Sequence, residues 1–229
     1  MRTLAVLPVK SFDAAKGRLR GRLDPAARAA LAEAMLDDVL AAIARAGEID
    51  GVAVVTRDPR AAAVARRTGA EVLPDPDEAG QSPAAAIGIG RALATGCDRV
   101  LLVPGDTPLL APADLDGLCA RATAASLGAA IVSDRHATGT NALLLRPPDA
   151  LVPSFGPDSL ARHVTSALRA GVVHAVEPIA ALEHDVDTPE DLAALDARLR
   201  ASEPATAPRT RAALDRIEPA RYPRSAAEA

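Results

Sequence analysis

Short apolar runs alternate along the chain with longer segments in which apolar positions recur every three or four residues. The short runs are nearly continuous in Val, Leu and Ile, a pattern typical of strands that are covered on both faces of a sheet. This pattern predicts strands at residues 4–9, 52–56, 71–75, 99–106, 129–134, 141–147 and 172–178.

The segments between these strands have the periodicity of amphipathic helices. The clearest covers residues 25–46, where Asp24 can cap the helix and Pro25 suits its first position. Its apolar residues lie four apart and so form a stripe along the helix: Leu31, Met35, Val39 and Ile43. Further helices are predicted near 60–68, 83–95, 112–122, 158–169 and 189–200.

Strands that alternate with helices predict right-handed crossover connections and a three-layer α/β fold with a mostly parallel, Rossmann-like sheet. In such sheets, ligands bind beyond the carboxyl ends of the strands. Functional side chains are therefore expected in the segments that follow the strands: residues 10–18, 56–58, 74–82, 106–107, 134–140 and 185–187.

The 229 residues suffice for one such domain, which we place at residues 1–200. The remaining residues, 201–229, hold four prolines and five arginines and only one short helical pattern, at 210–217. Segments of this composition bury little apolar surface. We therefore expect a disordered C-terminal tail.

Composition narrows the classes of partner. A formal net charge of −4 and an isoelectric point near 5.6 argue against nucleic acid or an anionic membrane surface as the main partner. Aromatic residues make up only 1% of the chain, so stacking can contribute little to holding a base. No apolar run is long enough for a membrane span or a signal peptide. The cysteines, Cys97 and Cys119, lack CxxC spacing, and we expect free thiols in a cytoplasmic protein.

The sequence EHDVDTPEDL contains two acids that helix capping does not explain. Thr188 and Pro189 are residue types that begin a helix. Asp185 and Asp187 are two residues apart, so an extended chain directs both carboxylates to one side, where they repel each other unless a cation compensates. Asp106, in LLVPGD, ends a predicted strand at the same edge of the sheet. Because magnesium prefers oxygen ligands, these three carboxylates predict a site for one or two Mg²⁺ ions.

Other polar loops suit phosphate groups. Lys10, Lys16 and Arg18 follow the first strand and can pair with a nucleotide triphosphate, although a solvated basic loop has the same composition. Their loop contains neither a Walker motif nor GxGxxG. The hydroxyl of Thr140, and the helix start that follows Gly156, are suited to a small anion, but ordinary turn chemistry explains them equally well.

Five motifs, in order, resemble a known family. They are PVKSFDAAKGRL, VPGDTPLL, ATGTNALLLRPP, FGPDSLARH and DVDTPEDL, and together they extend over roughly residues 3–200. The chain resembles the phosphoenolpyruvate or 2-phospho-L-lactate guanylyltransferases of coenzyme F-420 biosynthesis. The resemblance implies a GT-A-like nucleotidyltransferase fold. It also implies that GTP reacts with a phosphorylated three-carbon acid to give a guanosine diphosphate adduct and pyrophosphate.

The resemblance assigns roles to individual residues. Those that match the magnesium ligands are Asp106, Asp185 and Asp187. Those that match the site for the substrate's phosphate and carboxylate are Thr140, Gly156 and Ser159. Those that match the nucleotide-phosphate loop are Lys10, Lys16 and Arg18, and of these Lys16 and Arg18 are expected to act in catalysis.

One motif departs from the family pattern. A Gly-Leu-Asn turn of the family is replaced here by Gly80-Gln81-Ser82, and we assign Ser82 to the nucleotide. Two histidines, His136 and His163, lack metal-ligand spacing and receive no role.

The sequence defines the type of reaction more narrowly than the molecule that accepts the guanylyl group. The high Ala and Arg content resembles that of GC-rich bacterial genomes, which favours phosphoenolpyruvate; 2-phospho-L-lactate and 3-phosphoglycerate stay open. Hand-over of the product to the next enzyme of the pathway would follow from the resemblance. Two other interpretations are a nucleotidyltransferase for molybdopterin or a sugar phosphate, and a non-catalytic α/β binding module. The second of these leaves Asp185 and Asp187 without a compensating cation.

Overall fold

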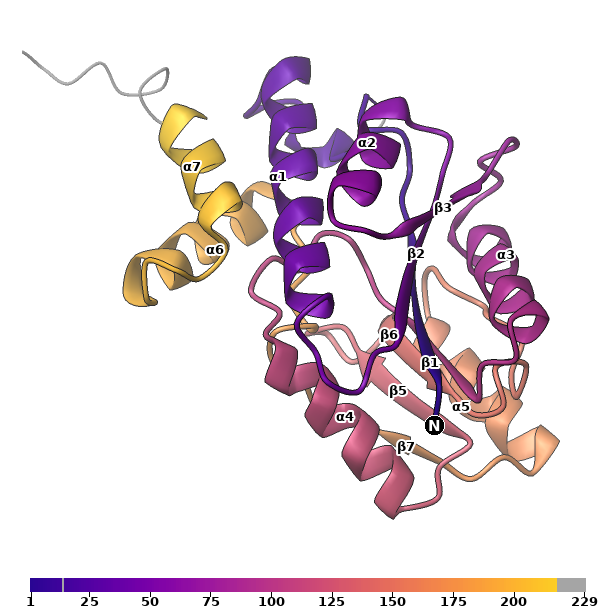
Figure 1. Ribbon diagram of the computed structural model, residues 1–229. Helices are drawn as coiled ribbons and strands as arrows, with labels where there is room; N and C mark the ends of the chain where they lie inside the picture. Colours follow the sequence, from indigo (N-terminus) through magenta and orange to yellow (C-terminus); the bar gives the residue numbers. More distant parts are fainter. Residues whose placement is uncertain (14, 218–229) are drawn as a thin grey trace, which may run out of the picture.

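A computed structural model describes residues 1–13 and 15–217, and in it all the predicted strands join one seven-stranded sheet (Figure 1). The strands are short, and the central residues of the five inner strands are buried, as the continuous apolar runs predict, whereas the two edge strands are only partly buried. Their bounds are β1 Thr3–Pro8, β2 Gly51–Thr56, β3 Glu71–Pro74, β4 Arg99–Leu102, β5 Ala129–Ser133, β6 Thr140–Leu145 and β7 His174–Val176.

The strand order is β3-β2-β1-β4-β6-β5-β7, and only β6 runs against its neighbours. A hairpin rather than a helix connects β5 to β6, so β6 starts at the edge where the other strands end. Thr140 and Asn141, the first residues of β6, therefore lie at the ligand-binding edge of the sheet. The predicted mostly parallel sheet is confirmed.

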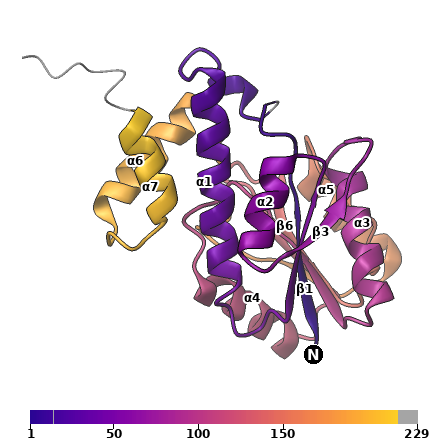
Figure 2. The ribbon, with the colours of Figure 1, turned by 45° about the horizontal axis from the view of Figure 1, so that its top comes forward.

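Helices cover both faces of the sheet, which confirms the three layers (Figures 1 and 2). One face packs against α1, α2 and α4, and the other packs against α3 and α5. The bounds are α1 Pro25–Ile43, α2 Pro59–Arg67, α3 Gln81–Ala94, α4 Pro112–Ala124, α5 Ser159–Ala170, α6 Pro189–Ala201 and α7 Pro208–Ile217, with a 3₁₀ turn at Gly17–Leu19.

Helix α1 lies between the sheet and a further layer that was not predicted. Asp24 caps α1 by accepting a hydrogen bond from the Ala27 N–H, as expected. The predicted stripe divides between two apolar clusters: Val39 packs against the sheet, whereas Leu31 and Met35 pack against α6 and α7. A helix that is apolar on more than one side is typically enclosed in this way.

The prediction of a disordered tail is wrong for residues 201–217. The short helical pattern forms α7, which packs along α1 and buries Leu214 to 7% exposure. The buried Asp38 of α1 accepts hydrogen bonds from the N–H groups of Arg209 and Thr210 at 3.2 and 2.7 Å. Asp38 thus provides acceptors for two backbone N–H groups in the first turn of α7, which have no partner within the helix. The packed unit thus extends beyond the predicted boundary at residue 200. The rest of the predicted tail, 218–229, lies outside the described residues.

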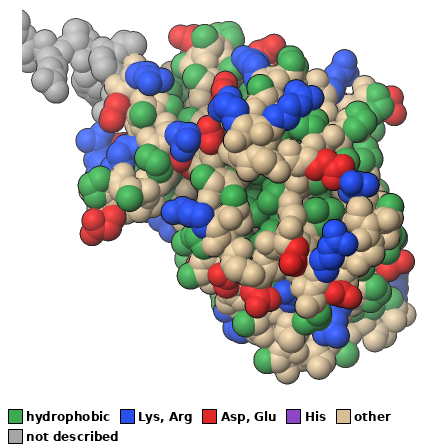
Figure 3. All heavy atoms as spheres, in the orientation of Figure 1, with side chains coloured by type: hydrophobic (Ala, Val, Ile, Leu, Met, Phe, Trp, Pro, Cys, Tyr) green, Lys and Arg blue, Asp and Glu red, His purple; other side chains and the backbone are tan. Residues whose placement is uncertain are grey.

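The surface carries both signs of charge. On the face seen in Figure 3, the Lys and Arg side chains are interspersed with Asp and Glu, in keeping with the small net charge. Within the described residues, no helix combines the length and the apolar character needed to cross a bilayer.

Candidate active site

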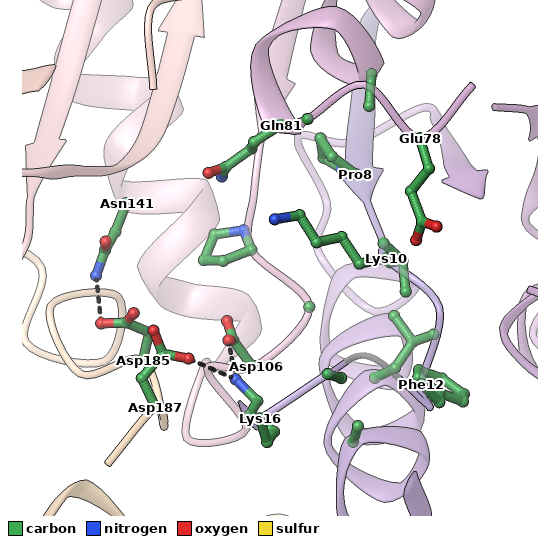
Figure 4. Close-up of a pocket in the computed structure, with 18 of the residues that line it drawn as sticks. Pro8, Lys10, Phe12, Lys16, Glu78, Gln81, Asp106, Asn141, Asp185 and Asp187 are labelled. Carbon is green, nitrogen blue, oxygen red and sulfur yellow. Dashed lines mark hydrogen bonds and ion pairs between the residues drawn. The ribbon is translucent and has the colours of Figure 1, made fainter. Parts of the chain in front are cut away.

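A cleft of about 340 Å³ opens at the carboxyl edge of the sheet. It is bounded by the loop after β1, the start of α3, the loop after β4, the start of β6 and the segment before α6. The rule for ligand sites in open α/β sheets predicts this position. Side chains from distant parts of the sequence meet here (Figure 4).

The three predicted metal ligands converge at one end of the cleft. Asp106 comes from the loop after β4, and Asp185 and Asp187 come from the segment before α6. One carboxylate oxygen from each lies within 4.8 Å of the others. The structure therefore brings together acids that are separated by almost 80 residues.

Lys16 lies among these acids. Its Nζ donates to Asp106, and it lies 3.2 Å from Oδ1 of Asp187 (Figure 4). The side chain is only 6% exposed, and the backbone at Lys16 is left-handed, with φ of 56°. Burial acts to lower the pKa of Lys16, but the charges of Asp106 and Asp187 outweigh it and raise the pKa. Lys16 is therefore a fixed positive charge within the acidic cluster.

Asp185, like the other two carboxylates of the cluster, is partly buried. Burial, followed by the charges of Asp106 and Asp187, raises its pKa, so keeping Asp185 ionised costs free energy. Asn141 supports it: Nδ2 donates to Oδ1 of Asp185 at 3.3 Å and to the Leu182 carbonyl at 2.7 Å. A divalent cation would lower the cost of keeping Asp185 ionised.

Asp187 is held by the cap of helix α6. Oδ2 of Asp191 accepts the N–H groups of Asp187 and Thr188 at 3.0 and 2.7 Å. The Thr188 hydroxyl in turn accepts the Asp191 N–H, completing a capping box. The other Asp191 oxygen pairs with Arg135. The predicted helix start thus also fixes the backbone of a metal-ligand candidate.

The opposite end of the cleft has a different character. Lys10 and Gln81 point into it from the end of β1 and the start of α3 (Figure 4). Asp75 and Glu78 line the same end, and Glu78 also accepts the Ser11 N–H, which joins the two loops. This end offers carboxylate, amide and ammonium groups to a ligand.

Two residues that the sequence analysis assigned to the nucleotide, Ser82 and Arg18, do not line the cleft. The hydroxyl of Ser82 accepts the Phe155 N–H at 2.8 Å and so ties α3 to the loop before α5. Arg18 has a side chain that is 74% exposed, 3.6 Å from Asp187, beside a shallow depression that Lys16 also lines. Arg18 can therefore reach a ligand only at the outer side of the acidic cluster.

Of the three predicted acceptor residues, Thr140 lines the cleft, whereas Gly156 and Ser159 do not. Ser159 is buried behind Thr140, and its hydroxyl accepts the Thr140 N–H at 2.8 Å. Gly156 adopts φ of 108°, which suits glycine, in the loop that leads into α5. Ser159 therefore supports Thr140 rather than facing the cleft.

Several cleft residues escaped the sequence analysis. Asp75 and Glu78 lie in a loop with no motif that marks them, and only their place after a strand pointed to them. Gln81, the first residue of α3, was noted only as part of the stretch Gly80-Gln81-Ser82 and received no role. Asn141 was counted as a strand residue, since the reversal of β6 is not visible in the sequence.

The acidic cluster fits a hard divalent cation. Three carboxylates offer oxygen atoms, which magnesium and calcium prefer, and none of the three ligand candidates is a sulfur or an imidazole. Because the pKa of Asp185 is raised, a bound cation would stabilise its ionised form. The residues therefore suit a metal, as the sequence predicted.

Comparison with known proteins decides the family. The model for guanylyl transferases, described as CofC like, matches residues 3–198. The chain belongs to this family. A phosphoenolpyruvate guanylyltransferase from Conexibacter woesei is 49% identical over 217 residues, covering 95% of this chain and 97% of the relative. A protein of the same name from Sphaerobacter thermophilus is 40% identical over 192 residues, covering 84% and 91%.

Solved structures agree on the fold of this CofC-like chain. A nucleotidyl transferase from Methanothermobacter thermautotroptrophicus has a TM-score of 0.62 and 18% identity, covering 88% of this chain and 99% of that one. The predicted family, the GT-A-like fold and the nucleotidyltransferase class are thereby confirmed.

Proposed function

We propose that the protein condenses GTP with phosphoenolpyruvate to give enolpyruvyl-diphospho-guanosine and pyrophosphate. The observation that carries the proposal is the meeting of Asp106, Asp185 and Asp187 with Lys16 at one end of the cleft. The two relatives described above bear the name of this activity. We further propose a cytoplasmic enzyme of coenzyme F-420 biosynthesis, which hands its product to the next enzyme.

In this reaction a phosphate oxygen of phosphoenolpyruvate attacks the α-phosphorus of GTP. The new phosphorus–oxygen bond forms as the bond to the β-phosphate breaks, and pyrophosphate leaves. A phosphate monoester is largely ionised at neutral pH, because its second pKa is about 6. The attacking oxygen therefore needs no protein base. What the protein must supply is positive charge between two anions.

We propose that Asp106, Asp185 and Asp187 hold one or two Mg²⁺ ions. Magnesium supplies charge neutralisation for the phosphates and the leaving pyrophosphate. Lys16, already within the cluster, adds a fixed charge at the same place. Lys10, which lines the cleft, and Arg18, which lies at the outer side of the acidic cluster, are assigned to the triphosphate.

We assign the guanine to the end of the cleft that Asp75, Glu78 and Gln81 line. A carboxylate accepts hydrogen bonds from N1–H and the amino group of guanine, which adenine cannot offer in the same arrangement. The small hydroxyl of Ser82, our sequence-based choice, is already bonded to the loop before α5. Thr140 lines the cleft and precedes Asn141, whose side chain contacts Asp185, and we assign Thr140 to the acceptor acid.

Pyrophosphate release tests the proposal. The protein is mixed with Mg²⁺, GTP and either phosphoenolpyruvate, 2-phospho-L-lactate or 3-phosphoglycerate, and the adduct is identified by mass. We expect release with GTP and phosphoenolpyruvate, and little with ATP or CTP. Release only with another of these acids changes the acceptor. Release only when molybdopterin or a sugar phosphate replaces the acid, in a parallel reaction, changes the pathway. No release with any acceptor supports a binding module and contradicts the proposal.

A further inference from the structure

His163 is a buried histidine on α5 that the reaction described above does not use. Its exposure is 0%, and both ring nitrogens have partners. Nε2 accepts the Ser154 N–H at 2.9 Å, and Nδ1 lies 2.9 Å from Oγ1 of Thr140. A backbone N–H can only donate, so Nε2 must present its lone pair. The single proton of the neutral ring is therefore on Nδ1, which donates it to Thr140.

The surroundings keep His163 in this form. Burial, together with the charge of Arg162, lowers the pKa of His163 to about 4, and Phe155 packs edge-on against the ring at 5.4 Å. Arg162 also holds the loop that carries the donor, because its guanidinium donates to the carbonyl and the hydroxyl of Ser154, each at 2.8 Å. The direction of the hydrogen bonds from Ser154 to His163 to Thr140 is thus fixed by the loop.

This direction decides what the Thr140 hydroxyl can do. Its oxygen accepts from His163, so its own proton is not used in that bond. The Thr140 N–H is occupied by Ser159, and across residues 1–13 and 15–217 the hydroxyl makes no other hydrogen bond. Thr140 lines the cleft, whose acidic end repels anions unless donors compensate. A hydroxyl that is free to donate is suited to an anionic ligand.

We propose that His163 is a positioning residue that makes the Thr140 hydroxyl a dedicated hydrogen-bond donor to the anionic acceptor acid. This rests on the proposed function, and it specifies how the acceptor, rather than GTP, is recognised. If the ring proton were on Nε2 instead, Nδ1 would accept the proton of the Thr140 hydroxyl, and the hydroxyl would then present only lone pairs to an anion.

Asn141, the residue after Thr140, links the Thr140 site to the acidic cluster. Asn141 follows Thr140 in β6 and holds Asp185 through Nδ2 (Figure 4). The start of one strand therefore carries both the donor to the acceptor acid and the support of a metal-ligand candidate. Fixing Thr140 through His163 and Ser159 fixes the acceptor relative to the acidic cluster.

Steady-state kinetics of four variants test the inference. His163→Leu and Thr140→Val are each expected to raise KM for phosphoenolpyruvate by about 10- to 100-fold, the usual range for a hydrogen bond to a charged group, with KM for GTP unchanged. His163→Asn keeps an N–H close to the position of Nδ1 and should recover most of the loss. The double variant should be no worse than Thr140→Val alone, since both changes remove one interaction.

Other results would overturn it. If His163→Leu raises KM for both substrates, or adds its full loss to that of Thr140→Val, His163 only supports the fold. His174→Leu, the same exchange at a histidine in β7 that does not line the cleft, is the matched control.

A measurement on the unaltered protein covers the case in which His163→Leu does not fold. Nitrogen-15 spectra at pH 7 are expected to show His163 neutral with the proton on Nδ1, the signal being assigned by its loss in His163→Asn. A ring protonated on Nε2, or on both nitrogens, overturns the inference. This readout needs no acceptor, so it stays decisive even if guanylyl transfer to phosphoenolpyruvate, and with it the proposed function, fails.

Discussion

At the scale of single residues, the site is governed by the repulsion among Asp106, Asp185 and Asp187. Three carboxylates with oxygens within 4.8 Å of one another destabilise a fold unless cations compensate. Lys16 supplies one positive charge, and although burial acts to lower its pKa, the charges of Asp106 and Asp187 raise it. Burial, followed by the charges of Asp106 and Asp187, raises the pKa of Asp185, so a further cation would favour its ionised form.

Replacing one acid by its amide separates metal binding from folding. We expect Asp106→Asn and Asp187→Asn to lower turnover by about 100-fold or more, because charge stabilisation in the transition state is lost. The fold should persist, since each change relieves repulsion. Pyrophosphate release and thermal unfolding measure the two effects. Asp149→Asn, at an exposed acid outside the cleft, is the control, and near-normal transfer in either cleft variant would refute the metal assignment.

Lys16→Met tests whether Lys16 acts as a counter-ion of the cluster. Without its charge, the acids should bind Mg²⁺ more tightly, so the metal should stabilise the variant more than the unaltered protein. An additional 1 kcal/mol would raise the metal-induced shift in Tm by about 2–4 °C for a chain of this size. Thermal unfolding with EDTA and with Mg²⁺ measures both shifts. Equal shifts would mean that Lys16 and the metal do not share the cluster.

At the scale of elements, the N-terminus of α6 does two things at once. The capping box of Thr188 and Asp191 satisfies the first N–H groups of the helix, and the same Asp191 carboxylate holds the Asp187 N–H. Burial acts to raise the pKa of Asp191, but hydrogen bonds from Thr188 and Asp187, with Arg135, lower it overall. The helix cap is therefore part of the support of the site.

Asp191→Asn should weaken both stability and activity. We expect a loss of about 1–3 kcal/mol in the free energy of unfolding at pH 7, together with a fall in turnover. The folded-state pKa is lowered, so the contribution of the carboxylate is present above its unfolded value near 3.8 and is lost as the pH falls through the folded-state pKa.

Urea unfolding at pH 7 and at about pH 3 checks the sign of this dependence. The difference between Asp191→Asn and the unaltered protein should shrink at the lower pH. Asp196→Asn, which breaks only an exposed i,i+4 pair with Arg200 on the same helix, is the control. A difference that does not change with pH would contradict the assigned role of the ionised carboxylate.

At the scale of the whole molecule, α1 connects two apolar cores. Its inner side packs on the sheet, and its outer side packs on α6 and α7 (Figure 2). The segment that carries Asp185 and Asp187 enters this outer layer, where Val186, between the two acids, is buried. The outer core therefore anchors the metal-ligand candidates from behind.

Leu214→Ala tests whether α7 is part of the folded unit. Truncating this buried side chain should lower the free energy of unfolding by about 2–5 kcal/mol, as for other core leucines. Activity per folded molecule should be kept, because α7 does not line the cleft. Leu168→Ala, at a leucine that is 67% exposed, should cost about 0.5 kcal/mol or less. Equal stability of the two variants would restore the interpretation of residues 208–217 as a dispensable tail.

The sequence by itself determined the elements and the chemistry of the acids. Apolar periodicity is a local property, so the strands, the helices and the mostly parallel sheet followed from it. Asp185, Asp187 and Asp106 could be selected because each follows a strand or precedes a helix in a recognisable motif. The family, too, followed from motifs that are contiguous in the sequence.

Tertiary structure alone decided the rest. The reversal of β6 places Asn141 at the ligand edge beside Thr140, and strand direction depends on pairing with distant strands. The packing of α7 depends on the outer side of α1, because α7 by itself contributes few apolar side chains. The directed contact between His163 and Thr140 joins residues 23 apart through a ring whose tautomer is set by Ser154. A hydrogen-bond direction is a property of neighbours in space, which the order of residues does not record.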